Sequence, residues 1–220
     1  MEENLENQTR IMSKTFFWMF LGLLGTAIMA WYTYSSGLVL KIIMGGSWEL
    51  LLISEVVVVI LFSLLFRKLS PTVVGILYFL YSMINGITLS TIFLMFELNS
   101  IIYLFLASAA IFGILAFIGY KTETDISNWH TILFTVLIVG LILSVINIFL
   151  GNSTLDLILD WVILFTFFGI TIYDMNILKN LQYEEGLNQD KLYIYGAMQL
   201  YLDFINIFLR ILSLFGKRRD

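Results

Sequence analysis

The sequence predicts an all-α membrane protein with seven membrane-spanning helices, and its composition, charge and hydropathy all point to this class. Sixty per cent of the 220 residues are apolar and only 13% are charged, whereas a soluble domain carries roughly 25% charged residues. The mean hydropathy is +0.92. Too few charged residues remain to cover a water-facing surface, so lipid is expected to surround most of the molecule.

Seven apolar runs are long enough to cross a bilayer, because a helix needs about 20 residues to span a hydrocarbon core of about 30 Å. The runs are continuous rather than alternating, which excludes the strands of a membrane barrel. The only proline, Pro71, lies just before the third run, where proline fits the start of a helix. The predicted spans cover residues 15–35, 48–66, 72–95, 101–119, 131–150, 157–178 and 192–215.

These spans are expected to form one domain, since neither a repeat nor a linker divides them. A polar tail covers residues 1–14, the helical domain covers 15–215 and a basic tail covers 216–220. Lys and Arg number seven on the N-terminal side and four on the other side. This bias predicts a cell-membrane protein with a cytoplasmic N-terminus and a C-terminus on the opposite side. The basic C-terminal tail argues against this orientation, and both ends would be inside if the last span re-entered.

The composition also excludes several functional classes. There is no cysteine, which rules out disulfides, thiolate metal sites and cysteine nucleophiles. His130 is the only histidine, so a metal site built from several histidines is excluded. We interpret His130 as an interfacial residue. The net charge of -4 is spread over loops and ends, so no basic stripe predicts a nucleic-acid partner. No cofactor is predicted, and the lipid bilayer is the partner that this composition implies.

The last predicted span carries a polar stripe along its whole length. At about 100° per residue, six polar side chains fall within a strip about 80° wide. Such a stripe faces other helices or a water-filled path rather than lipid. The alternative is that it only joins helices through hydrogen bonds. Its members are Tyr195, Gln199, Asp203, Asn206, Arg210 and Ser213.

The sixth predicted span offers an acidic partner for Asp203. Asp160, Thr171 and Asp174 share one face of this span, and Asp174 lies about one turn from the cytoplasmic end. Counted from the ends of the two spans, Asp203 lies about 10 Å deeper in the membrane than Asp174. The two depths agree if the first turns of the last span lie in the membrane–water interface. Two adjoining carboxyls would share one proton and titrate between acid and neutral pH. Protonated, the pair would clasp the two spans together, and deprotonated it would repel itself and attract cations.

Glu55 and Arg210 are predicted to form a second pair. Counted from the ends of their spans, their depths agree to within about 3 Å. Pairing would neutralise two charges that are costly inside a membrane. We interpret this pair as a contact that stabilises the fold rather than as a gate.

Motifs in the last two spans resemble the transmembrane Bax-inhibitor-motif family. The sixth span ends with GITIYD at residues 169–174, and the seventh contains LYLDFINIFLRIL at residues 200–212. NGITL at residues 85–89 and Glu55 fit the bacterial members. The likeness covers nearly all spans in order, and the segment in the seventh span is its specific part.

The resemblance implies a seven-helix fold with the seventh span at the centre of a bundle of six. Members of the family leak Ca²⁺ in a pH-dependent way, and an aspartate pair on the last two spans senses pH and closes the pore. Asp174 and Asp203 match these positions, so they are predicted to sense pH and to bind Ca²⁺ transiently. The polar stripe and Thr171 would then line the pore. The arginine that latches onto the pair in bacterial members corresponds to Lys68 or to its neighbour Arg67.

Two other functions stay open. Intramembrane aspartyl proteases also use two aspartates on adjacent spans, and Tyr173 before Asp174 is similar to half of their motif. However, Asp203 follows Leu-Tyr-Leu rather than Gly-x-Gly, and no Pro-Ala-Leu motif is present. A membrane adaptor that acts through a protein partner in proteolysis, stress or cell death is the other alternative. The main prediction is a non-enzymatic, pH-gated cation leak with Ca²⁺ as the passing ion.

Overall fold

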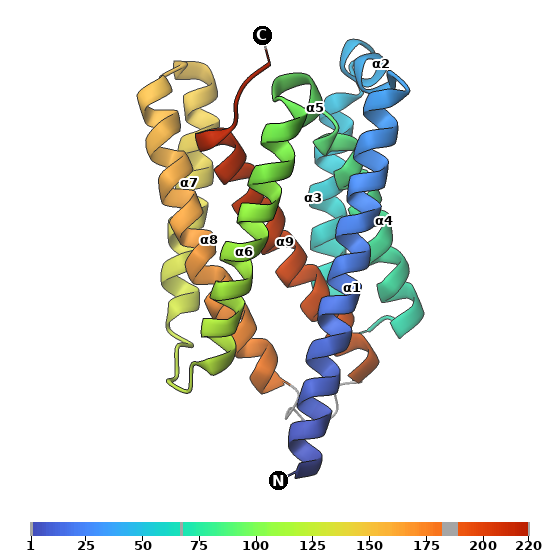
Figure 1. The fold of residues 1–220 in the computed structure, drawn as a ribbon, viewed down its shortest axis with the longest axis vertical. Helices are drawn as coiled ribbons and strands as arrows, with labels where there is room; N and C mark the ends of the chain where they lie inside the picture. The colour runs from blue at the N-terminus through green and yellow to red at the C-terminus, as the bar shows by residue number, and fades with distance from the viewer. Residues whose placement is uncertain (1, 67, 182–188, 220) are drawn as a thin grey trace. The chain divides into compact units, whose positions relative to one another are not determined.

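The computed structural model describes residues 2–66, 68–181 and 189–219, and over these ranges the chain is helical apart from short connections (Figure 1). The all-α prediction is confirmed for these residues. The helices are α1 (Glu2–Ser35), α2 (Leu38–Met44), α3 (Trp48–Leu65), α4 (Pro71–Leu89), α5 (Ile92–Met95), α6 (Leu98–Lys121), α7 (Trp129–Leu150), α8 (Ser153–Leu181) and α9 (Gln189–Phe215).

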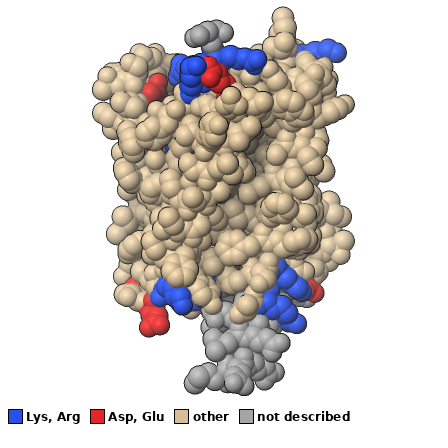
Figure 2. Space-filling model, in the orientation of Figure 1, with Lys and Arg blue, Asp and Glu red and all other residues tan. Residues whose placement is uncertain are grey.

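Six helical segments are long and apolar enough to cross a membrane, namely α1, α4 with α5, α6, α7, α8 and α9. The apolar part of α3, Leu50–Leu65, is shorter. The seventh crossing, which depends on α3, therefore stays a prediction, as does the central position of the last span. On the face that Figure 2 shows, charged side chains gather at the ends of the helices and leave an uncharged surface between them.

Several helices extend beyond the predicted apolar runs, because polar residues at the interface continue a helix until a cap or a glycine ends it. Thus α1 begins at Glu2, and the predicted polar tail is helical over its described residues. Helix α2 was not predicted. It lies between Gly37 and Gly46, whose φ angles of 71° and 67° allow the chain to turn sharply at both ends.

The start of α4 agrees with the sequence prediction. Pro71 lies in the first turn, where its missing N–H leaves no helical hydrogen bond unmade. The hydroxyl of Ser70 accepts a hydrogen bond from the backbone N–H of Val73 at 3.4 Å, which caps the helix.

The predicted span 72–95 is divided into α4 and α5 at two hydroxyl residues. Ser90 donates to the carbonyl of Ile87 at 2.6 Å, and Thr91 donates to the carbonyl of Thr88 at 3.0 Å. Such bonds offer the main chain an alternative to continuing the helix. The apolar pattern alone does not reveal this interruption.

The packing of the helices divides the chain into two compact units. The first unit comprises residues 1–96, 180–201 and 219–220, and the second comprises residues 97–179 and 202–218. Helix α9 thus contributes its first half to the first unit and its second half to the second unit.

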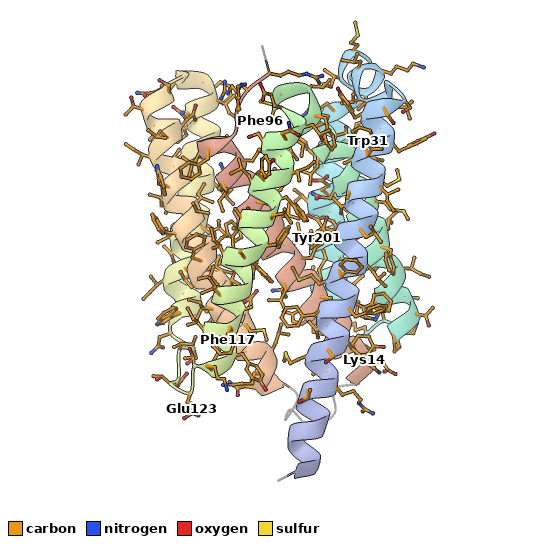
Figure 3. All side chains as sticks on the ribbon, in the orientation of Figure 1. Lys14, Trp31, Phe96, Phe117, Glu123 and Tyr201 are labelled. Carbon is orange, nitrogen blue, oxygen red and sulfur yellow. The ribbon has the colours of Figure 1, made fainter. Side chains whose placement is uncertain are left out.

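In the first unit, α4 packs against both α1 and α3 (Figure 1). Gly86 allows the close approach of α4 to α1, because a Cβ atom at this position would lie 2.6 Å from the carbonyl oxygen of Thr26. Lys14 and Trp31 lie near the two ends of the apolar part of α1 (Figure 3). The close approach of α1 and α4 at Gly86 places polar residues of the two helices side by side inside the unit.

In the second unit, α8 packs against α6 and α7 through glycine. Gly119 of α6 leaves no room for a side chain against the main chain of α8 at Ile172. Gly140 of α7 lies against Ile163, and Gly169 of α8 lies against Leu133 of α7. Small residues at such crossings let membrane helices approach closely without a hydrophobic driving force.

Candidate functional site

Asp203 is the one charged residue that is buried among the residues the structure describes, with 3% of its surface exposed. It lies on α9 directly before the buried Phe204 and about one turn before the buried Ile207. Within the described ranges, its carboxyl oxygen Oδ2 is buried without a hydrogen-bond partner. A buried acid that lacks a full set of partners is costly in an apolar environment, and this cost marks Asp203 as a functional candidate.

Two side chains of α8 act on the carboxyl of Asp203. The half-buried Asp174 lies within electrostatic range of it, and the hydroxyl of Thr171 lies within hydrogen-bonding reach. That hydroxyl donates its own proton to the carbonyl of Phe167 at 2.8 Å. A hydroxyl has one proton and two lone pairs, so Thr171 can donate to an ionised Asp203 or accept from a protonated one. The arrangement can hold a proton between α8 and α9.

The end of α8 that carries Asp174 is tied to the end of α6 on both sides of the acid. Before it, Ile172 packs on Gly119. After it, the side-chain nitrogens of Asn176 and Lys179 each donate to the carbonyl of Thr122 at 2.7 Å. These bonds occupy a carbonyl that the end of α6 would otherwise leave unpaired. The main chain around Asp174 is thus held in place by another helix.

At its other end, α9 carries an ion pair whose partners differ from the prediction. Nη1 of Arg210 lies 2.6 Å from Oδ1 of Asp160, and the Ser213 hydroxyl donates to the other oxygen of this carboxyl. We expected Glu55 to pair with Arg210, and the partner in the structure is Asp160. Asp160 lies seven residues after the start of α8, and Arg210 lies five residues before the end of α9. The depth argument that favoured Glu55 therefore fits Asp160 equally well.

Glu55 lies on α3 in the first unit, beside neutral groups. The side chains of Asn85 and Thr88 on α4 lie within hydrogen-bonding reach of its carboxyl. The phenols of Tyr81 and Tyr201 lie within electrostatic range. Its oxygen Oε1 is buried, and no described residue hydrogen-bonds to it. Glu55 is thus a half-buried acid with one buried oxygen and with polar but uncharged surroundings.

A buried cluster of hydroxyl groups adjoins Glu55, and no pattern in the sequence predicts it. Tyr201, near the middle of α9 (Figure 3), donates to Oδ1 of Asn85 at 3.0 Å. Its hydroxyl oxygen lies 2.6 Å from that of Thr26 on α1, and Thr26 donates to the carbonyl of Ser82 at 2.9 Å. These residues come from three helices and share no motif. The available signal was that Thr26, Ser82 and Asn85 interrupt otherwise apolar runs.

The remaining members of the predicted polar stripe lie in different environments. The ring of Tyr195 stacks on Phe66 with 4.3 Å between centroids. Asn206 donates to a main-chain carbonyl one turn back at 2.8 Å, and Gln199 is half-buried. The other faces of α9 are buried as well, as at Ile207, which is 0% exposed. The stripe is therefore not the sole buried face of α9, and a pore along it stays a prediction.

The predicted latch lies only partly within the described residues. Arg67 lies outside them. Lys68 follows α3 and is exposed. The latch consequently stays a prediction.

Comparison with known proteins gives these residues a family context. Residues 8–220 match the family described as "Inhibitor of apoptosis-promoting Bax1". The inner membrane protein YbhL of Escherichia coli (strain K12) is 37% identical over 214 residues, which cover 94% of this chain and 92% of that protein. A protein of Deinococcus radiodurans is 33% identical over 225 residues, covering 100% and 95%. A membrane protein of Streptococcus pyogenes serotype M1 is 33% identical over 166 residues, covering 75% and 72%.

Proposed function

The chain belongs to the family of inhibitors of apoptosis-promoting Bax1, and from this membership and the geometry around Asp203 we propose that it is a pH-controlled cation leak that passes Ca²⁺. It is a multi-pass helical protein of the cell membrane, as its apolar helices and its inner-membrane relative indicate. The observation that carries the proposal is the buried oxygen of Asp203, which no described residue hydrogen-bonds, with Asp174 in electrostatic range.

The proposed control is a proton shared between Asp174 and Asp203. Two neighbouring carboxyls in apolar surroundings cannot both be ionised without a large cost. With one shared proton, a hydrogen bond joins α8 to α9. Without it, two negative charges repel one another and attract a cation. Low pH therefore favours the closed form, and high pH favours the form that passes ions.

The side chains around Asp203 offer fewer oxygen ligands than a tight Ca²⁺ site uses, as expected for passage rather than storage. Within the part of the chain that the structure describes, no group of three or more His, Cys, Asp or Glu side chains could hold a metal ion. Tight Ca²⁺ sites use six to eight oxygen ligands, and conduction requires that the ion leave again. Asp174 and Asp203, with Thr171 beside them, would bind Ca²⁺ transiently during its passage.

Calcium entry into liposomes that contain the purified protein and an enclosed calcium dye tests the proposal. The wild type should pass Ca²⁺ at a rate that increases from acid to mildly alkaline pH. Asp174→Asn and Asp203→Asn should each abolish or shift this dependence. Asp156→Asn makes the same chemical change at an exposed acid of α8 and should leave the dependence intact.

Each possible outcome of the flux experiment bears on a separate part of the proposal. A wild-type protein that passes no cation contradicts the leak and favours an adaptor that acts through a protein partner. Flux with the same pH dependence in both aspartate variants removes the sensor role. Replacing Arg67 and Lys68 together by Ala should raise the basal flux, and an unchanged flux removes the latch.

A further inference from the structure

The first unit contains an acid that the proposed leak does not use. The groups that act on the Glu55 carboxyl are Asn85 and Thr88, within hydrogen-bonding reach, and the phenols of Tyr81 and Tyr201. The two phenols are the titratable groups that face it from α4 and α9. Oε1 of Glu55 is buried without a partner among the described residues. An ionised carboxyl in these neutral surroundings carries an uncompensated charge, which a bound proton cancels.

Asn85 connects Glu55 to a chain of hydrogen bonds that crosses the first unit. On one side its amide lies within reach of the Glu55 carboxyl, and on the other its Oδ1 lies 3.0 Å from the Tyr201 hydroxyl. The next link joins Tyr201 to Thr26 at 2.6 Å, and the last joins Thr26 to the carbonyl of Ser82 at 2.9 Å. The chain therefore passes from α3 through α4 and α9 to α1, and it ends at a carbonyl that can only accept.

The direction of the donors along this chain depends on the charge of Glu55, because each hydroxyl has a single proton. When Glu55 is ionised, the amide nitrogen of Asn85 donates to it and Tyr201 donates to the amide oxygen. Thr26 then has one proton for two acceptors, the Tyr201 hydroxyl and the Ser82 carbonyl, so one of these two links is left without a proton. The 2.6 Å contact between Thr26 and Tyr201 permits either oxygen to be the donor.

When Glu55 is protonated, the donors of the Glu55–Asn85 and Asn85–Tyr201 links point away from Glu55 instead of toward it. The carboxyl O–H donates to the amide oxygen of Asn85, which requires the amide to turn over. The amide nitrogen of Asn85 then donates to Tyr201. Tyr201 donates to Thr26, and Thr26 donates to the Ser82 carbonyl. Every link of the chain is filled in this arrangement, whereas the ionised arrangement leaves one link empty.

We propose that Glu55 is a second proton-binding site and that the chain Glu55–Asn85–Tyr201–Thr26 reverses its hydrogen-bond direction when the proton binds. The ligand of this site is the proton itself. The site belongs to the first unit, whereas the proposed calcium control belongs to the second unit. Its test needs no ion flux, so it succeeds or fails independently of the leak.

Proton binding is tested in a protein that already carries Asp174→Asn and Asp203→Asn. In detergent, the thermal unfolding midpoint should still change in a step with pH. The infrared difference spectrum between acid and alkaline pH should still contain a C=O band of a buried protonated carboxyl. Adding Glu55→Gln should remove both signals. If either signal is unchanged by Glu55→Gln, the proposal that Glu55 binds a proton is wrong.

The chain is tested with two tyrosine variants in the same background. Tyr201→Phe removes the hydroxyl from the chain and keeps the ring, so the midpoint of the step should shift by roughly half a pH unit or more, the size expected from one hydrogen bond. Tyr78→Phe is the control, because the Tyr78 hydroxyl donates outside the chain, to the Trp18 carbonyl at 2.9 Å. Equal shifts in the two variants overturn the chain. If Glu55→Gln fails to fold, an unshifted step in Tyr201→Phe overturns the whole proposal.

Discussion

The two ends of the contact between α8 and α9 in the second unit place acids in opposite surroundings. At one end Asp160 meets Arg210 at 2.6 Å, and Ser213 donates to its second oxygen. At the other end Asp203 meets another acid, Asp174, and one of its oxygens has no described partner. Opposite charges hold two helices together over a wide pH range, whereas like charges do so only with a shared proton. The first end thus serves as a brace, and the second is the end that pH can change.

The largest effect is expected when the brace is broken. Arg210→Met leaves Asp160 charged and without its cation, a change that costs about 3–5 kcal/mol at a fully buried pair. Here the side chains are 28% and 13% exposed, so we expect a loss of about 2–3 kcal/mol after allowing for solvent screening. The free energy of unfolding in detergent measures this loss.

The double variant Asp160→Asn with Arg210→Met is the control for the brace. It removes both charges, so it should recover part of the stability that Arg210→Met loses. A single variant as stable as the wild type, or a double variant that recovers nothing, would show that the ion pair does not brace the helices.

At the other end of the same contact, removing an acid should have the opposite sign. Asp203→Asn eliminates the repulsion with Asp174, so it should stabilise the protein by about 1 kcal/mol at mildly alkaline pH. The gain should vanish as the pH falls, because the shared proton then cancels this repulsion in the wild type as well. Unfolding curves of the variant and the wild type, recorded from acid to mildly alkaline pH, measure the difference in their free energies of unfolding. A variant less stable than the wild type at alkaline pH would contradict the like-charge interpretation.

A smaller effect is expected from the hydroxyl beside Asp203. Thr171→Val keeps the shape and removes an oxygen, so it should cost about 1 kcal/mol, the value of one hydrogen bond. Thr166→Val is the matched control, because Thr166 lies on the same helix and likewise donates to its own main chain, at 2.7 Å from the Val162 carbonyl. Equal losses in the two variants would show that Thr171 contributes nothing to the site.

The smallest effect is expected at an exposed ion pair. Lys217 Nζ lies 2.6 Å from Oε1 of Glu97, the same separation as in the brace, but the side chains are 72% and 38% exposed. Lys217→Met should therefore change the free energy of unfolding by less than about 0.5 kcal/mol. A loss as large as that of Arg210→Met would mean that burial does not distinguish the two pairs.

Much of this molecule could be predicted from local patterns. Apolar runs of sufficient length indicated helices, and Pro71 marked the start of α4, because both signals act within one segment. The motifs at residues 169–174 and 200–212 indicated the family, which the match over residues 8–220 confirms. The break at Ser90 was missed, since two hydroxyls that bond to their own main chain leave the apolar pattern unchanged.

The sequence alone determined the all-α class, the membrane environment and the acids worth examining, because length, hydropathy and the cost of a buried charge are properties of single segments. Only the tertiary structure decided that Arg210 pairs with Asp160, and only it joined Asn85, Tyr201 and Thr26 in one chain. Counting along a helix gives the depth of a residue but not which helix lies beside it. Neighbours are chosen by close packing, such as the approach of α1 to Gly86, and that choice involves residues far apart in the sequence.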